Sequence, residues 1–208
     1  NIVSINSKSV PAEGIFTVEI QVDNTDAFVA FQTDIPIPAG FTFQDGSALL
    51  NSMRISGHSL SASMVSSKLR LIAYSATNAP FVGSSGTLIS FNLKASSVPG
   101  DYSLSLTNSL LGNSTSKSVV HSVKNGVITV EGSNIQLSTI DLNFGRVALT
   151  SNSSQYIIVR NSGNQNLVVS SITFSESQFS SPQSAGFTLT AGQSRQVQVV
   201  FAPTIKGN

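Results

Sequence analysis

Any nucleophilic or acid–base chemistry in this chain depends on two histidines, His58 and His121. A nucleophilic site needs a serine or threonine, a histidine base and an acid that orients the base. Ser59 and Ser122 follow the two histidines, but serine is so abundant here that such neighbours are expected by chance. The chain contains no Gly-x-Ser-x-Gly elbow. We therefore expect both histidines to be surface or rim residues on strands.

Carboxylates are too sparse to indicate a glycosidase. That chemistry needs two carboxyl groups that face each other across a cleft. The chain has 10 Asp and Glu residues, scattered along its length, and the edges of β-sandwiches rarely form a catalytic cleft. The sequence predicts a protein that is not an enzyme.

The acidic loop Asp23-Asn24-Thr25-Asp26 is the best candidate for a metal site. Calcium binds several oxygen ligands, often from Asp and Asn in loops. The alternative is a turn in which Asp and Asn side chains bond to their own backbone. We favour the turn, and we expect no cofactor unless calcium binds at Asp23, Asn24 and Asp26.

Composition excludes several classes of protein. The 208 residues include no cysteine, which rules out disulfides, a thiol nucleophile and zinc–cysteine clusters. The net charge is +1 and no Lys/Arg cluster is present, so we expect no nucleic-acid partner. No apolar run approaches the ~18 residues of a membrane span. Hydrophobic residues are 40%, which is enough for a core.

Aromatic residues do not favour sugar stacking. Tryptophan is absent, and the tyrosines are Tyr74, Tyr102 and Tyr156. Tyr102 and Tyr156 stand among apolar residues of strands, which predicts core or core-edge positions. The phenylalanines mostly share the inward phase of their strands. Direct binding of a polysaccharide is therefore less well supported than binding of a protein.

The dominant hydrophobic period is two, which is typical of half-buried β-strands. Phe16, Val18, Ile20 and Val22 alternate with polar residues without a fault. Equivalent runs span 28–37, 68–75, 87–93, 102–106, 126–130, 155–160, 167–174, 187–190 and 194–201. Helical spacing occurs only at 46–53 and supports one short turn. Short strands separated by Gly, Pro and Asn turns predict an all-β chain of sandwiches.

A boundary is expected near residues 130–134. The run 126–130 has the pattern of a closing strand, and a new alternation begins at Ile135. The sequence predicts one β-sandwich over 1–132 and a second over 133–208. The second is short for an immunoglobulin-like domain of about 100 residues. We expect it to be C-terminally incomplete, with its final strands beyond Asn208.

The first segment resembles the cohesin domain, a jelly-roll sandwich related to some carbohydrate-binding modules. The features that carry the resemblance occur in order along 1–132. They are Pro11-Ala-Glu-Gly14 before the strand 16–23, Val29-Ala-Phe-Gln-Thr-Asp-Ile35, Gly86-Thr-Leu-Ile-Ser-Phe91, Pro99-Gly100-Asp-Tyr-Ser-Leu-Ser-Leu106 and Asn125-Gly126-Val-Ile-Thr-Val130.

The second segment is similar to the immunoglobulin-like modules of bacterial surface proteins that share a pattern with the ASH (Aspm/SPD-2/Hydin) group. The matching residues are Leu142-Asn-Phe-Gly145, Asn161-Ser-Gly163-Asn and Val200-Phe201-Ala-Pro203. The family fold is a seven-stranded sandwich, and the resemblance implies that 133–208 has this fold without its last strands.

Cohesins bind the dockerin module of a partner through one sheet face that includes their third strand. The resemblance places that strand at 28–34. Its phase leaves Ala30, Gln32 and Asp34 outward. For the neighbouring strand 68–75, either Arg70, Ile72 and Tyr74 or the alternate set faces outward. We take Ala30, Gln32, Asp34, Arg70 and Tyr74 as candidate partner-binding residues, with a solvated, partner-free face as the alternative.

The sequence thus predicts a non-catalytic interaction or scaffolding module of a secreted or cell-surface bacterial protein. A dockerin-like module is the expected partner. The second hypothesis is a carbohydrate-binding module associated with polysaccharide degradation. A hydrolase accessory domain with its own activity is the third.

Overall fold

The computed structural model describes residues 1–206, and within them every regular element is a β-strand. None of these residues forms a helix that is long and apolar enough to cross a membrane. The chain divides into two compact units, Asn1–Val130 and Glu131–Asn208. The expected all-β fold is confirmed.

The first unit contains thirteen strands. They are β1 (Ile2–Ile5), β2 (Lys8–Pro11), β3 (Ile15–Asp23), β4 (Ala30–Pro36), β5 (Thr42–Phe43), β6 (Leu49–Leu50), β7 (His58–Val65), β8 (Lys68–Ser75), β9 (Thr87–Lys94), β10 (Gly100–Leu104), β11 (Thr107–Gly112), β12 (Ser122–Lys124) and β13 (Gly126–Glu131).

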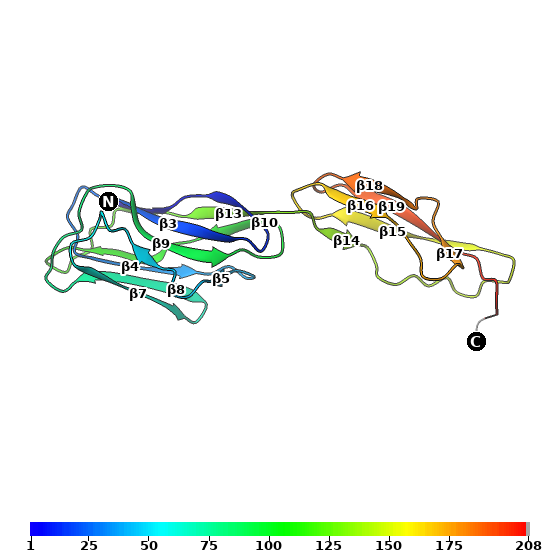
Figure 1. Cartoon of the computed structure of the whole chain (residues 1–208), viewed down its shortest axis with the longest axis horizontal. Helices are drawn as coiled ribbons and strands as arrows, with labels where there is room; N and C mark the ends of the chain where they lie inside the picture. The colour runs from blue at the N-terminus through cyan, green and yellow to red at the C-terminus, as the bar shows by residue number, and fades with distance from the viewer. Residues whose placement is uncertain (207–208) are drawn as a thin grey trace. The chain divides into compact units, whose positions relative to one another are not determined.

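These strands form two main sheets and a smaller one (Figure 1). The first has the order β12-β1-β3-β9-β5, with β6 also paired to β9. The second has the order β11-β4-β8-β7, and the third is β10-β13-β2. Parallel pairing occurs between β1 and β12, whereas β3–β9, β4–β8 and β7–β8 are antiparallel.

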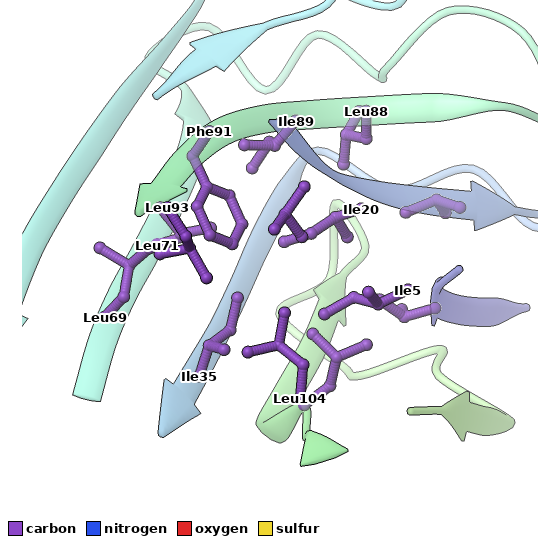
Figure 2. Close-up of a cluster of buried hydrophobic side chains, with 14 of the residues drawn as sticks. Ile5, Ile20, Ile35, Leu69, Leu71, Leu88, Ile89, Phe91, Leu93 and Leu104 are labelled. Atoms are coloured by element: carbon purple, nitrogen blue, oxygen red, sulfur yellow. The ribbon is translucent and has the colours of Figure 1, made fainter. Parts of the chain in front are cut away.

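One hydrophobic core joins these sheets. Alternate residues of β3, including Ile20, pack with Phe91 and Leu93 of β9 and with Ile35 and Leu71 of the facing sheet. Figure 2 shows these side chains converging from the ribbons around them. All five are fully buried. Burying a side chain of this size stabilises the fold by about 1.5–3 kcal/mol, so this cluster fixes the register of the strands.

The helical turn expected at 46–53 is wrong. Leu49 and Leu50 instead form β6, which pairs with Ser90 and Ile89 of β9. Pairing with an existing strand satisfies the backbone and lets Leu50 pack on the core. A turn follows, in which the Arg54 N–H donates to the Asn51 carbonyl at 2.9 Å. Tertiary pairing here outweighs a weak local preference.

Up to residue 206, where the described part of the chain ends, the second unit contains six strands in two sheets. The orders are β14-β15-β19-β17 and β16-β18. The bounds are β14 (Ile135–Leu137), β15 (Ser153–Asn161), β16 (Leu167–Ser171), β17 (Phe179–Ser180), β18 (Ala185–Leu189) and β19 (Ser194–Phe201). Val159, Leu189 and Val197 form its buried core.

The Asn161-Ser-Gly163 segment has a structural role. Asn161 is completely buried, and its Oδ1 accepts hydrogen bonds from the N–H groups of Asn134 (3.2 Å) and Gly163 (3.0 Å). Its Nδ2 donates to the carbonyls of Gln165 (2.7 Å) and Leu189 (3.0 Å). A Cβ on Gly163 would lie 2.3 Å from the Gly132 carbonyl oxygen, so only glycine fits there. This one amide therefore ties together three loops of the unit.

Replacing Asn161 with Ala tests this role. The change leaves buried backbone groups without partners, and we expect the free energy of unfolding of the second unit to fall by about 3 kcal/mol. Hydrogen exchange of amides in β15 and β19 measures the loss. The exposed Asn152→Ala is the control, and equal protection in both variants would contradict the assigned role.

Candidate functional site

The outer surface of the sheet β11-β4-β8-β7 carries the candidate site. We call this surface the β4–β8 face and define it by Leu110 and Asn108 of β11, Ala30, Gln32 and Asp34 of β4, Arg70, Ile72 and Tyr74 of β8, and Ser59, Ser61, Ser63 and Val65 of β7. All five predicted partner-binding residues belong to it.

The strand register decides which side chains share this face. Leu69, Leu71 and Ala73 are fully buried, so Arg70, Ile72 and Tyr74 point outward, which resolves the ambiguity left by the sequence. Pairing of β4 with β8 places Ala30 opposite Tyr74, Gln32 opposite Ile72 and Asp34 opposite Arg70. The predicted residues therefore form two adjacent rows.

Asp34 has the predicted phase, but the expectation of an outward carboxylate available to a partner is wrong. The residue is 1% exposed. Its Oδ1 accepts from Arg70 Nε at 2.7 Å, and its Oδ2 accepts from Arg70 Nη2 and Asn108 Nδ2, both at 2.9 Å. The long Arg70 side chain lies over the carboxylate and covers it.

These hydrogen bonds hold the pKa of the Asp34 carboxyl well below its usual range, with Arg70 as the largest cause and Asn108 next. Burial acts in the opposite direction and is outweighed. The same pairing raises the pKa of Arg70, whose side chain stays 40% exposed. Of this pair, Arg70 and not Asp34 is the group whose charge is open to a partner.

Asn108 and Leu110 were missed by the sequence-based prediction. The β4–β11 register shifts between Thr107 and Leu110, so this strand lacks a simple alternation. Asn108 adopts a left-handed backbone (φ 52°) at the irregularity, which lets its amide reach Asp34. The inward-facing Thr33 hydroxyl bonds to Ser109 Oγ at 2.8 Å beside the same bulge.

Exposed apolar side chains lie across the centre of the β4–β8 face. Tyr74 is 50% exposed and Leu110 is 39% exposed. Ile72 lies half-buried next to Tyr74 on β8, and the strand pairing places Gln32 of β4 between Ile72 and Leu110. Ser59, Ser61 and Ser63 border this patch along β7 and are exposed. An aromatic and aliphatic centre with an arginine at its rim has the residue types enriched in protein interfaces.

The acidic loop at 23–26 is held by hydrogen bonds. Asn24 Oδ1 accepts from Arg54 Nη2 at 2.9 Å, and Asn24 Nδ2 donates to the Asp26 carbonyl at 3.1 Å. Asp26 Oδ2 accepts from Asn1 Nδ2 at 3.1 Å. Among the described residues, no group of three or more His, Cys, Asp or Glu side chains could hold a metal ion.

Arg54 is a buried residue that sequence reasoning missed. It is 4% exposed and donates to the carbonyls of Val82 (2.6 Å), Val22 (3.1 Å) and Gly86 (3.2 Å). Its charge lies directly beside Asn24, which makes that amide oxygen a poor ligand for a second cation. Burial lowers the pKa of Arg54, and the nearby Asp23 partly offsets this.

The expectation of two surface histidines is wrong for His58. Its ring is buried and stacks on Phe81, with ring centroids 3.7 Å apart. Its Nδ1 accepts from the Ser56 N–H at 3.0 Å, and burial lowers its pKa. His121 is exposed as expected. His58 and Ser59 are consecutive residues of β7, so their side chains point to opposite sides of the sheet and do not form a nucleophilic dyad.

The prediction of core or core-edge positions is right for one tyrosine and wrong for the other. Tyr102 packs against the core and its hydroxyl donates to the Val98 carbonyl at 2.8 Å, which confirms its core-edge position. Tyr156 is 51% exposed, so its predicted core position is wrong. The exposed rings of Tyr74 and Tyr156 belong to different units.

Comparison with known proteins agrees with the two-sandwich architecture. Residues 133–208 match the family model described as HYDIN/CFA65/VesB-like, Ig-like domain. The expected immunoglobulin-like module is thereby confirmed. A search of curated proteins found no match to the chain.

Solved cohesin structures resemble the chain over a share that corresponds to the length of the first unit. A non-cellulosomal cohesin from Archaeoglobus fulgidus has a TM-score of 0.54 and 14% identity, covering 63% of this chain and 91% of that one. The cohesin CaCohA2 from Clostridium acetobutylicum has a TM-score of 0.53 and 19% identity, covering 62% and 89%.

The sixth cohesin of scaffoldin B from Acetivibrio cellulolyticus, solved in complex with a mutant Cel5 dockerin, has a TM-score of 0.52 and 15% identity, and the match covers 62% and 97%. At these identities the likeness shows the fold. The first unit has the cohesin fold, as expected from the sequence.

Replacing Asp34 with Asn tests the buried ion pair. We expect the free energy of unfolding of the first unit to fall by about 1–3 kcal/mol at neutral pH, between the values for exposed and for buried pairs, because Arg70 is half-exposed. The pKa of Asp34 is depressed in the folded state, so its stabilisation is present above its unfolded value and is lost as pH falls. The gap between the two proteins should therefore close below about pH 4.

Denaturant unfolding of both proteins from neutral to acidic pH measures this gap. The exposed Asp101→Asn serves as a matched carboxylate control. A gap that stays constant down to pH 2, or no gap at neutral pH, would show that the pair does not stabilise the fold.

Proposed function

We propose that this chain is a non-catalytic protein-interaction module that binds a dockerin-like partner through the β4–β8 face. One observation carries the proposal: a broad sheet surface on a cohesin fold exposes Leu110 and Tyr74, with the half-buried Ile72 and a half-exposed Arg70 on the same surface. Cohesins of the same fold have been solved in complex with dockerins. A dockerin-like partner for this chain is inferred from those complexes as part of the proposal.

The contacts available on this face define the chemistry of the partner. Its centre requires an apolar surface that can cover Leu110, Ile72 and Tyr74. The Asp34 carboxylate uses two of the Arg70 donor nitrogens, Nε and Nη2, and Nη1 remains to bond a carbonyl or carboxylate of the partner. The serine row of β7 provides neutral hydroxyl groups at the edge of the contact.

The proposed setting is a secreted or cell-surface bacterial protein in which the immunoglobulin-like unit acts as a neighbouring structural module. In this role the chain positions its partner and carries out no reaction. Polysaccharide binding is the competing function, and the experiment below separates the two.

Binding of dockerin modules encoded by the source organism tests the proposal. The full chain is immobilised, and the dissociation constant of each dockerin is measured by surface plasmon resonance. We expect at least one dockerin to bind, and Tyr74→Ala to weaken that binding about 30-fold, the effect of losing a buried aromatic anchor.

Leu110→Asp and Val127→Asp form a matched pair, because both native side chains are 39% exposed and lie on strands of different sheets. We expect only Leu110→Asp to abolish binding. Equal binding by both variants would reject the β4–β8 face. Retention of the chain on a cellulose or xylan matrix, with no dockerin bound, would favour the carbohydrate-binding function instead.

A further inference from the structure

The free edge of β7 differs from the other sheet edges of the first unit. β7 is eight residues long, pairs with β8 without a register shift from His58 to Val65, and ends the sheet β11-β4-β8-β7. Figure 1 shows it along the border of its unit. Its sequence, His-Ser-Leu-Ser-Ala-Ser-Met-Val, holds no Lys, Arg, Asp, Glu or Pro.

Other edges carry features that block pairing with another strand. Proteins protect edge strands with charges, proline, bulges or very short length. β11, at the opposite end of the same sheet, has a register shift, and the Leu111 carbonyl accepts from the Val119 N–H. β2 contains Lys8 and Pro11, β10 contains Asp101, and β5 has two residues. β7 has none of these features.

The backbone of β7 presents hydrogen-bonding groups along this edge. The Ser75 N–H donates to the Val29 carbonyl on the β4 side of β8. Because N–H and C=O groups alternate sides along a strand, Arg70, Ile72 and Tyr74 face β7 and bond to Ser63, Ser61 and Ser59.

The intervening residues of β7 therefore direct their backbone groups away from β8. Leu60, Ala62 and Met64 each present an N–H and a C=O to the open side of the sheet. Such a row is a template for an added strand.

We propose that β7 pairs antiparallel with β7 of a second copy of this chain, about a two-fold axis at Ser61. This register places Leu60 opposite Ala62 of the second copy, so a large side chain meets a small one on the inner surface. On the outer surface Ser59 faces Ser63 and Ser61 faces itself. Because β7 has no charged residue, self-pairing brings no like charges together across the strand pair.

The same register uses every outward-directed backbone group in the middle of the strand. Leu60 and Ala62 of each copy exchange both of their hydrogen bonds across the axis, as residues in a closely bonded antiparallel pair do. The two four-stranded sheets become one continuous sheet. The β4–β8 faces of the two copies then lie side by side on one surface.

Ser61 provides a test that leaves the single chain intact, because its side chain is exposed. Sedimentation equilibrium of the full chain, without partner, is carried out at concentrations up to about 1 mM, since one strand pair buries less area than a stable interface. We expect the mass to rise from one chain toward two. S61K puts two lysines opposite each other and should weaken the dimer about fivefold, and S61E should do the same.

An equimolar mixture of S61K and S61E brings opposite charges together at the axis. We expect it to associate more tightly than either variant alone. The control S103K adds the same charge to an exposed serine of β10 and should leave the dimer unchanged, and circular dichroism checks that each variant is folded.

A wild-type chain that stays at the mass of one chain would overturn the proposal. Dimerisation of S61K equal to wild type, or no gain in the mixture, would place any association at another surface and would also overturn it. The measurement contains no dockerin, so its outcome is independent of the proposed partner binding.

Discussion

The packing of β3 and β9 against β4 and β8 determines the rest of the first unit. Alternate residues of these four strands enter one core, and Ile20, Phe91, Ile35 and Leu71 are fully buried there. A shift of one residue would turn every apolar side chain of a strand to solvent. The core therefore fixes the register of the strands. The register in turn determines the outer surface, because the side chains between the core positions point away from the core.

Polar groups inside the molecule are few, and each of the main ones joins segments that are distant in sequence. Arg54 bonds three carbonyls and Asn24, Asp34 is bonded by Arg70 and Asn108, and Asn161 holds three loops of the second unit. A chain with 10% charged residues can use a charge inside only where several hydrogen bonds offset its desolvation. Such groups stabilise one arrangement of loops against the alternatives.

Periodicity was sufficient to predict the all-β fold class and most of the strands, and the resemblance to cohesins indicated which strands carry the candidate site. β8 and β19 begin and end where the alternation does, and the outward phase of Ala30 and Gln32 follows from the same pattern. The outward phase of Tyr74 became clear only from the burial of Leu69, Leu71 and Ala73. Periodicity did not predict the structure correctly where contacts between residues distant in sequence determine it. Asp34 is buried by a side chain from a neighbouring strand, Asn108 reaches it through a bulge, and β6 forms because β9 offers a partner. His58 is buried because Phe81, 23 residues away, covers its ring. No local pattern contains that information.

The near absence of free charge on the β4–β8 face has a kinetic consequence. Its only acid is already paired with Arg70 within the molecule, and the exposed Lys68 lies at the end of the face, where β8 begins. The rest of the surface is serine, asparagine, glutamine and apolar side chains. Long-range electrostatic attraction, which accelerates many protein associations and weakens with salt, has little to act on here. A partner would bind this surface without electrostatic steering, at the association rates typical of neutral proteins. The association rate constant would change little between low and high salt concentrations. Selectivity between partners would then depend on the dissociation rate of the complex, which is set by how well the apolar surfaces fit together.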